Sequence, residues 1–134
     1  MTPPYKVVDK YQEPLEIQLA VNFLGHCVLI NRLMSLVEAA PAGRLALVAS
    51  EGYATAPRKT GIAFEDLSFS NGYDALTAYG HSKIAVMLLS QEFSRRLEGT
   101  NITSNSIHPG VIRTNLASDT ESFKVNDKIP DNFG

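Results

Sequence analysis

Residues 44–50 read RLALVAS, a short apolar run that follows the proline- and glycine-containing break AAPAG at residues 39–43. A continuous apolar run of this length is typical of a buried parallel strand that is covered on both faces. A second strand is predicted within residues 101–110, NITSNSIHPG, because the final His-Pro-Gly gives a sharp stop. These two strands decide the fold class.

Two long helices are predicted around the first strand. Residues 15–38 are rich in apolar side chains over a wide sector, so we expect this helix to be buried on most sides. Pro14 suits its first position, and Gly99 suits the end of a second helix that runs from about residue 73 to 97. Strand, helix and strand in this order imply a right-handed crossover, which predicts an α/β fold with a parallel sheet.

Composition limits the class of protein. The chain has 134 residues, enough for one domain with a core, and a net charge of −2 without the basic excess that nucleic-acid binding usually needs. A single cysteine, Cys27, excludes an intramolecular disulfide and fits a reducing compartment. With no run of 18 apolar residues and no secretory signal, the sequence predicts a cytoplasmic protein without a transmembrane segment.

The remaining segments are predicted as irregular structure. Residues 1–12 read as a loop, and residues 51–72 form a connection rich in Gly, Thr, Ser and Pro. A connection of that length in a compact domain is usually functional, for example as a lid. Residues 117–134 are polar and non-periodic, so we expect a domain at residues 1–116 followed by a flexible tail.

The stretch TAYGHSKIAVML, residues 77–88, places Tyr79 and Lys83 one helical turn apart on the same face. A cation at that distance favours the ionised form of a phenol, which suits an acid–base catalyst. The spacing also arises by chance, and a surface lysine beside a half-buried tyrosine is the simpler interpretation. Context decides between them: Ser50 ends the first strand and Pro109-Gly110 ends the second, at the sheet edge where ligands bind in open α/β sheets.

Four motifs occur in the order and at about the spacing found in short-chain dehydrogenases/reductases: AVNFLGH, GRLALVAS, AYGHSK and SIHPGVIRTNL. The chain therefore resembles that family, and the IAFEDL segment at residues 62–67 resembles its retinol-dehydrogenase-like branch. The resemblance implies a partial Rossmann-like, doubly wound parallel sheet built from a long helix, a strand, a helix and a strand. Because no two glycines form Gly-x-Gly, the N-terminal nucleotide-binding half is missing from the match, which also stops short at the C-terminal side.

The resemblance implies a role for each motif residue. Tyr79 would be the general acid/base, and Lys83 would lower the pKa of that phenol and bind the nicotinamide ribose. Ser50 would position and polarise the substrate carbonyl or hydroxyl, and Asn22 would hold a backbone carbonyl and a water relay behind the lysine. Three further residues would contact the cofactor: Pro109, Gly110 and Thr114.

The implied function is the NAD(P)-dependent interconversion of an alcohol and a carbonyl. The branch resemblance slightly prefers NADP over NAD and suggests a lipophilic small-molecule substrate. It also implies a homo-oligomer that forms through the two long helices. The alternative is a non-catalytic dehydrogenase fragment that cannot bind the cofactor and acts, if at all, through self-association or a partner.

Two other site types fit the sequence poorly. A hydrolase built on GHSKI, residues 80–84, would need glycine in place of Ile84, and Ser82 falls inside the predicted helix instead of at its start. A metal site has no ligand-like spacing, so we expect none and expect His81 to face the cleft or the solvent. The residues considered for a metal were His26, Cys27, His81 and His108.

Overall fold

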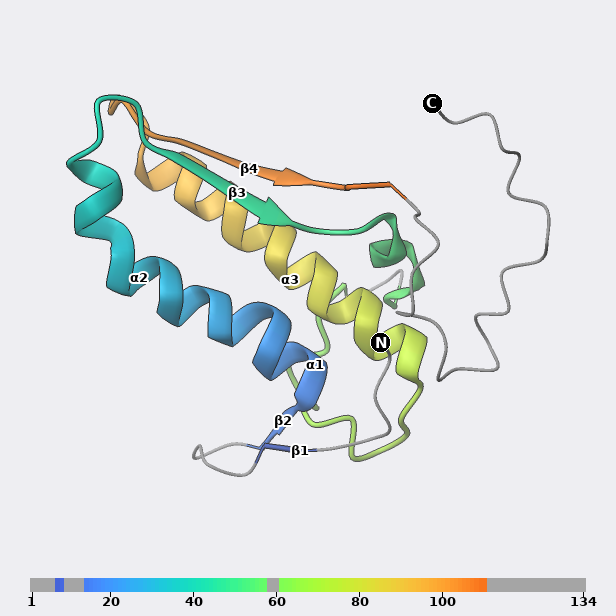
Figure 1. The fold of residues 1–134 in the computed structure, drawn as a ribbon. Helices are drawn as coiled ribbons and strands as arrows, with labels where there is room; N and C mark the ends of the chain where they lie inside the picture. Colours follow the sequence, from blue (N-terminus) through green and yellow to red (C-terminus); the bar gives the residue numbers. More distant parts are fainter. Residues whose placement is uncertain (1–6, 9–13, 58–60, 111–134) are drawn as a thin grey trace.

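The structure is a computed structural model that describes residues 7–8, 14–57 and 61–110. Two of the sequence predictions, the tail at residues 117–134 and the cofactor contact of Thr114, lie outside the described residues. Within them the chain forms a short parallel sheet with long helices packed against it (Figure 1). The α/β fold class predicted from the sequence is confirmed, as a partial Rossmann-like fold.

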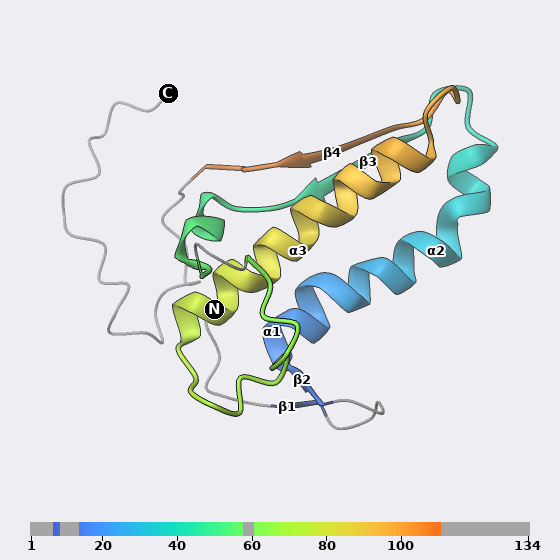
Figure 2. The same ribbon diagram turned by 180° about the vertical axis from the view of Figure 1, so that it is seen from behind.

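The parallel sheet consists of β3 (Arg44–Val48) and β4 (Thr103–Ile107), paired from Arg44 opposite Thr103 to Val48 opposite Ile107. Helix α3 (Ala75–Arg96) connects them, and it lies on the same face of the sheet as α2 (Gly25–Glu38), as both views show (Figures 1 and 2). Both strands therefore end at the same edge. That edge carries the residues singled out in the sequence.

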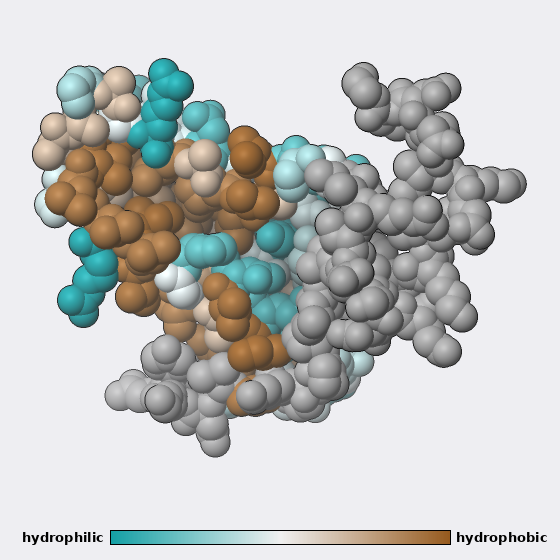
Figure 3. Space-filling view, viewed as in Figure 1, coloured by the Kyte–Doolittle hydropathy of each residue, from teal (hydrophilic) through white to brown (hydrophobic). Residues whose placement is uncertain are grey.

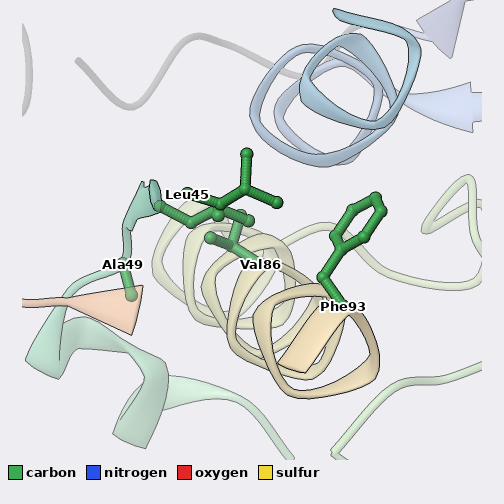
Figure 4. Packing of buried hydrophobic residues seen from close by; sticks show 5 residues of the cluster. Leu45, Ala49, Val86 and Phe93 are labelled. Atoms are coloured by element: carbon green, nitrogen blue, oxygen red, sulfur yellow. The ribbon is translucent and has the colours of Figure 1, made fainter. Parts of the chain in front are cut away.

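The core lies between the sheet and the two helices (Figure 4). Its buried members are Leu45, Leu47, Ala49, Val86 and Phe93. Burial alternates along β3, so that Arg44, Ala46 and Val48 point away from the helices and are exposed. The prediction that this strand is covered on both faces is wrong for the described chain, because α2 and α3 lie on one face of the sheet.

The first long helix starts later than predicted and is interrupted. It comprises α1 (Ile17–Leu19), a π-helical turn η1 (Ala20–Leu24) and α2. Pro14 is not its first residue, because the Glu16 carboxylate accepts the N–H groups of Gln18 and Leu19 and so fixes the start at Ile17. Before the helix, β2 (Leu15–Glu16) pairs antiparallel with β1 (Val7–Val8). The β1 strand lies in the segment predicted to be a loop, and β2 occupies the first two residues of the predicted helix.

The predicted burial of this helix on most sides is also wrong. The side of α2 that bears Ile30, Met34 and Val37 packs against the core, whereas the other side is a broad apolar surface (Figure 3). We call this surface the α2 apolar face; its residues, between 43% and 68% exposed, are Val28, Leu29, Leu33 and Leu36. Nothing in the described part of the chain covers it.

By length and composition alone, the helical run Ile17–Glu38 could cross a membrane, since its mean hydropathy is 1.4. The sequence prediction of no transmembrane segment rested on uninterrupted apolar runs, and this helix contains polar residues between its apolar ones. A core helix of a soluble protein passes the same test, so the finding by itself assigns no membrane.

Outside residues 58–60, local hydrogen bonds organise the connection between β3 and α3. It begins with a 3-10 helix, η2 (Glu51–Thr55), and later folds around Asp66. The Asp66 carboxylate accepts the backbone N–H groups of Asn71 and Ser70, which hold the pKa of that carboxyl well below its usual range. Asp74 then caps α3 by accepting the N–H of Thr77 at 2.7 Å.

Candidate functional site

Ser50 lies directly after β3 and opens η2. Its Oγ accepts the backbone N–H of Gly52 at 3.1 Å, and its carbonyl oxygen accepts the N–H of Tyr53 at 3.1 Å. Ser50 is half-buried. Because the Gly52 bond occupies one lone pair of Oγ, the hydroxyl proton is available for a second bond. Ser50 is thus placed at the carboxyl edge of the sheet as a potential donor.

Tyr79 and Lys83 share one face of α3, as their spacing predicts. The Lys83 Nζ lies 5.5 Å from the centroid of the Tyr79 ring, within the range of a cation–π interaction. The same Nζ donates to the carbonyl oxygen of Val48, the last residue of β3, at 3.0 Å. Partial burial lowers the pKa of the Lys83 ammonium below its ordinary value. Both side chains are half-buried.

Gly52 is the meeting point of Ser50 and Tyr79. A Cβ built on Gly52 would lie 2.7 Å from the Cε1 of Tyr79 and 3.2 Å from the Oγ of Ser50. The phenol ring and the serine hydroxyl therefore both lie next to the α-carbon of Gly52. The structure brings together Ser50, Tyr79 and Lys83, which the sequence placed on three different segments.

Asn22 contacts the same part of α3 by a different route. It lies in η1, where the N–H of Gly25 bonds to the carbonyl of Ala20, and such π-helical turns are frequent at functional sites. The Asn22 Nδ2 donates to the Oγ of Ser82 at 3.0 Å, and Ser82 donates to the carbonyl oxygen of Tyr79 at 2.7 Å. The observed bond of Asn22 thus leads to the backbone of Tyr79.

Ser82 links Asn22 to Tyr79, a role that the sequence motifs did not predict. It is fully buried in the interior of α3 and holds two hydrogen bonds, so it cannot serve as an exposed nucleophile. This geometry argues against the hydrolase alternative. Its signal in the sequence was the position three residues after Tyr79, from which a serine hydroxyl can reach back to the preceding turn.

The end of β4 is joined to the residue after Ser50. The Nδ1 of His108 accepts the N–H of Glu51 at 3.3 Å, and the His108 Nε2 lies 3.7 Å from the Glu51 carboxylate. One step back, the N–H of Ala49 bonds to the carbonyl of Ile107 at 2.8 Å. Pro109 and Gly110 follow directly and are exposed at the same edge.

His81 is buried, contrary to the expectation that it faces the cleft or the solvent. Its Nε2 accepts the backbone N–H of Ala63 at 3.0 Å, and its ring meets Phe69 edge-on with centroids 5.3 Å apart. Burial lowers the pKa of this imidazole. His81 therefore fastens the long connection onto α3. Among the residues that the structure describes, no group of three or more His, Cys, Asp or Glu side chains could hold a metal ion.

The residues at this edge fit one end of a nicotinamide cofactor. The Lys83 ammonium and the Tyr79 phenol are donors that suit the hydroxyls of a ribose, and Pro109 and Gly110 follow β4 at the same carboxyl edge of the sheet. The pyrophosphate end usually needs a glycine-rich turn that leads into a helix. The sequence contains no Gly-x-Gly, so the fit is limited to the nicotinamide and ribose end.

Comparisons with known proteins agree on one family. Residues 68–124 match the family model described as short chain dehydrogenase. The chain is 43% identical over 108 residues to "Retinol dehydrogenase 14" of Mus musculus, an alignment that covers 80% of this chain and 31% of the relative. It is 36% identical over 110 residues to "Retinol dehydrogenase 13" of Homo sapiens, with 81% and 32% covered.

A solved structure supports the same relationship. A protein of Pseudomonas syringae described as a short chain dehydrogenase superposes with a TM-score of 0.57 and 27% sequence identity, over 75% of this chain and 35% of that one. The chain spans about a third of the length of the curated relatives that it matches.

Proposed function

We propose that this chain, which carries part of a short-chain dehydrogenase of the retinol-dehydrogenase-like branch, contributes the proton-transfer residues of an NAD(P)-dependent alcohol–carbonyl interconversion. The observation that carries the proposal is the meeting of the Ser50 hydroxyl, the Tyr79 ring and the Lys83 ammonium at the sheet edge. Ser50 and Tyr79 flank Gly52, and the Lys83 ammonium lies 5.5 Å from the tyrosine ring.

In this proposal the substrate oxygen lies between two hydroxyls. Ser50 donates to it, because its Oγ already accepts the Gly52 N–H and its proton is free to point elsewhere. During reduction the Tyr79 hydroxyl gives its proton to the same oxygen, and during oxidation it takes the proton back. The charge of Lys83 favours the phenolate that remains on Tyr79 after the transfer.

The protein also keeps Tyr79 in place. The chain of bonds from Asn22 through Ser82 fixes the backbone of the turn from which the phenol projects. A bound nicotinamide cofactor would supply or accept the hydride, while the protein supplies orientation and the proton. Lys83, Tyr79, Pro109 and Gly110 would hold its ribose and nicotinamide end.

The names of the relatives support the proposed substrate class, and the cofactor preference rests on the resemblance to the branch alone. The names of two relatives describe them as retinol dehydrogenases, which favours a lipophilic alcohol or aldehyde such as a retinoid. We propose NADP(H) in slight preference to NAD(H). The residues that would bind the 2′-phosphate of NADP lie outside the motifs that this sequence matches.

A second candidate function is supported by the α2 apolar face. A non-catalytic fragment that associates with another copy of itself would cover this face, and the homo-oligomer proposed for the chain would use both α2 and α3. Exposed apolar patches of this kind mark interaction sites. The two candidates are separable, because self-association without cofactor binding would support the second and contradict the first.

The decisive experiment is a calorimetric titration of the purified chain with NADPH and NADH, followed by turnover of all-trans-retinaldehyde. Saturable heat together with turnover that Tyr79→Phe abolishes would support the oxidoreductase. No heat with either cofactor, in a sample that is folded by circular dichroism, would contradict it. Sedimentation velocity on the same sample then tests self-association.

A further inference from the structure

Two glycines lie where η2 packs against α3, Gly52 on the first element and Gly80 on the second. A Cβ added at Gly80 would lie 2.6 Å from the backbone nitrogen of Ala56 and 2.8 Å from the carbonyl oxygen of Gly52, and closer still to the hydroxyl oxygen of Thr55. Side chains do not approach backbone atoms so closely. Any larger residue at position 80 must therefore separate η2 from α3.

Gly52 contacts both of the proposed catalytic groups. Its missing Cβ would lie 2.7 Å from Cε1 and 3.1 Å from Cδ1 of Tyr79, and 3.2 Å from the Oγ of Ser50. Its N–H donates to that Oγ at 3.1 Å. The same residue thus limits the position of the phenol ring on one side and sets the direction of the serine hydroxyl on the other.

The hydroxyl of Thr55 ties the same turn to α3. Its Oγ1 lies 2.8 Å from the carbonyl oxygen of Gly52 and 2.6 Å from that of Leu76, one helical turn before Gly80. Thr55 is exposed, so its side chain contributes through the one proton that its hydroxyl donates to these carbonyl oxygens and not through burial. The close approach of the two backbones at the glycines and the hydrogen bonding of the Thr55 hydroxyl therefore act together where η2 meets α3. We call this junction the glycine seam; its residues are Gly52, Thr55 and Gly80.

We infer that Gly52 and Gly80 are positioning residues, which hold the Ser50 hydroxyl and the Tyr79 phenol at the separation that one substrate oxygen requires. The inference rests on the proposed function. A substrate oxygen must lie within about 2.6–3.2 Å of each hydroxyl that bonds to it. Since a misplacement of about 1 Å can cost about 10²-fold in rate, the seam has a direct effect on turnover.

The test compares Gly52→Ala and Gly80→Ala with Gly25→Ala as a matched control. Gly25 is also helical, but a Cβ there would meet only the carbonyl of Ala20, at an ordinary 3.6 Å. With NADPH and all-trans-retinaldehyde, we expect kcat to fall about 10²-fold in the two seam variants, with KM and the cofactor Kd unchanged. Gly25→Ala should keep the kcat of the parent chain.

A spectroscopic readout keeps the inference testable without turnover. In the chain labelled with ¹³C-tyrosine, Tyr79→Phe identifies the Tyr79 ring among five tyrosine signals. The Tyr79 signal should shift in both seam variants and stay in place in Gly25→Ala. If the parent chain shows no turnover, the proposed function fails. The position of the Tyr79 signal in the seam variants then tests on its own whether the two glycines hold the phenol ring in place.

Thr55 provides variants that leave the glycines intact if either alanine variant does not fold. Thr55→Val removes the tie and should lower kcat and shift the Tyr79 signal, whereas Thr55→Ser keeps a hydroxyl and should restore both. The inference is overturned if folded Gly52→Ala or Thr55→Val leaves both the Tyr79 signal and kcat as in the parent chain. A rise in KM with kcat unchanged in these variants would overturn it too.

Discussion

The side-chain amide of Asn22 donates to the hydroxyl of Ser82 at 3.0 Å, which joins the π-helical turn to the helix of Tyr79. Ser82 is fully buried, and it passes the connection on to the Tyr79 carbonyl at 2.7 Å. A buried donor or acceptor that loses its partner cannot turn to bulk water. The bond therefore links the stability of the fold to the placement of the proposed acid–base residue.

Replacement of Ser82 by alanine should lower the free energy of unfolding by about 1–3 kcal/mol, because it removes both hydrogen bonds of a fully buried hydroxyl. Urea denaturation measures the change. Ser94→Ala, at an exposed position on the same helix, is the control and should stay within about 0.5 kcal/mol of the parent chain. In a double-mutant cycle with Asn22→Ala, strictly additive losses would contradict the coupling.

His81 should make the protein less stable in mild acid. Burial lowers the pKa of this imidazole in the folded state, so the unfolded chain binds the proton more readily. The contribution of His81 is present above the unfolded pKa of about 6.5 and is lost as the pH falls below it. Protonation would also remove the acceptor for the Ala63 N–H.

The measurement for His81 is the free energy of unfolding between pH 7.5 and pH 5, values that bracket the ordinary histidine pKa of about 6.5. The contribution of His81 is the difference between the parent chain and His81→Gln in the slope of the unfolding free energy against pH. Exposed His26→Gln serves as the control. Equal slopes in the parent chain and His81→Gln would show that the buried imidazole does not titrate in this range.

The α2 apolar face should drive self-association. Leu29→Gln combined with Leu36→Gln replaces two exposed leucines, 54% and 68% accessible, without removing core contacts. We expect the double variant to sediment as a smaller species than the parent chain, with the same thermal unfolding midpoint. Phe64→Gln alters an equally exposed apolar side chain elsewhere and should leave sedimentation unchanged. An unaltered sedimentation coefficient in the double variant would rule out this face.

If the chain turns over an alcohol or a carbonyl, Tyr79→Phe should reduce kcat by about 10²–10⁴-fold, since it removes the proton that is transferred. The phenyl ring keeps its place against Gly52, so the circular dichroism spectrum should not change. Tyr53→Phe removes the hydroxyl of an exposed tyrosine on η2 and is the matched control. Comparable kcat values in the two variants would assign the proton transfer to another group.

The sequence predicted the parts of the fold that depend on local pattern. The strand at residues 44–50, the helix at 73–97 and the meeting of Ser50 with Tyr79 follow from apolar runs, turn residues and the rule that parallel strands end at one edge. The structure places β3 and α3 within those ranges. The roles assigned to the meeting residues stay proposals.

Errors arose wherever the environment of an element mattered. An apolar run does not reveal whether one or two faces of a strand are covered, and Val48 proved to be exposed. Helical periodicity did not reveal the π-helical turn at Asn22. His81 was misplaced because its partner, the Ala63 N–H, lies in an irregular connection whose path no residue pattern specifies.

The pairing of β3 with β4 also governs how the chain folds in time. It joins residues as distant in sequence as Arg44 and Thr103, whereas the bonds within α2 and α3 are local. Local contacts form early and long-range strand pairing is slow, because the loop between the strands must first be closed. In pulse-labelling hydrogen exchange, the amides of α3 should gain protection before those of β4. The sheet edge that carries Ser50 would then be the last part of the site to be assembled.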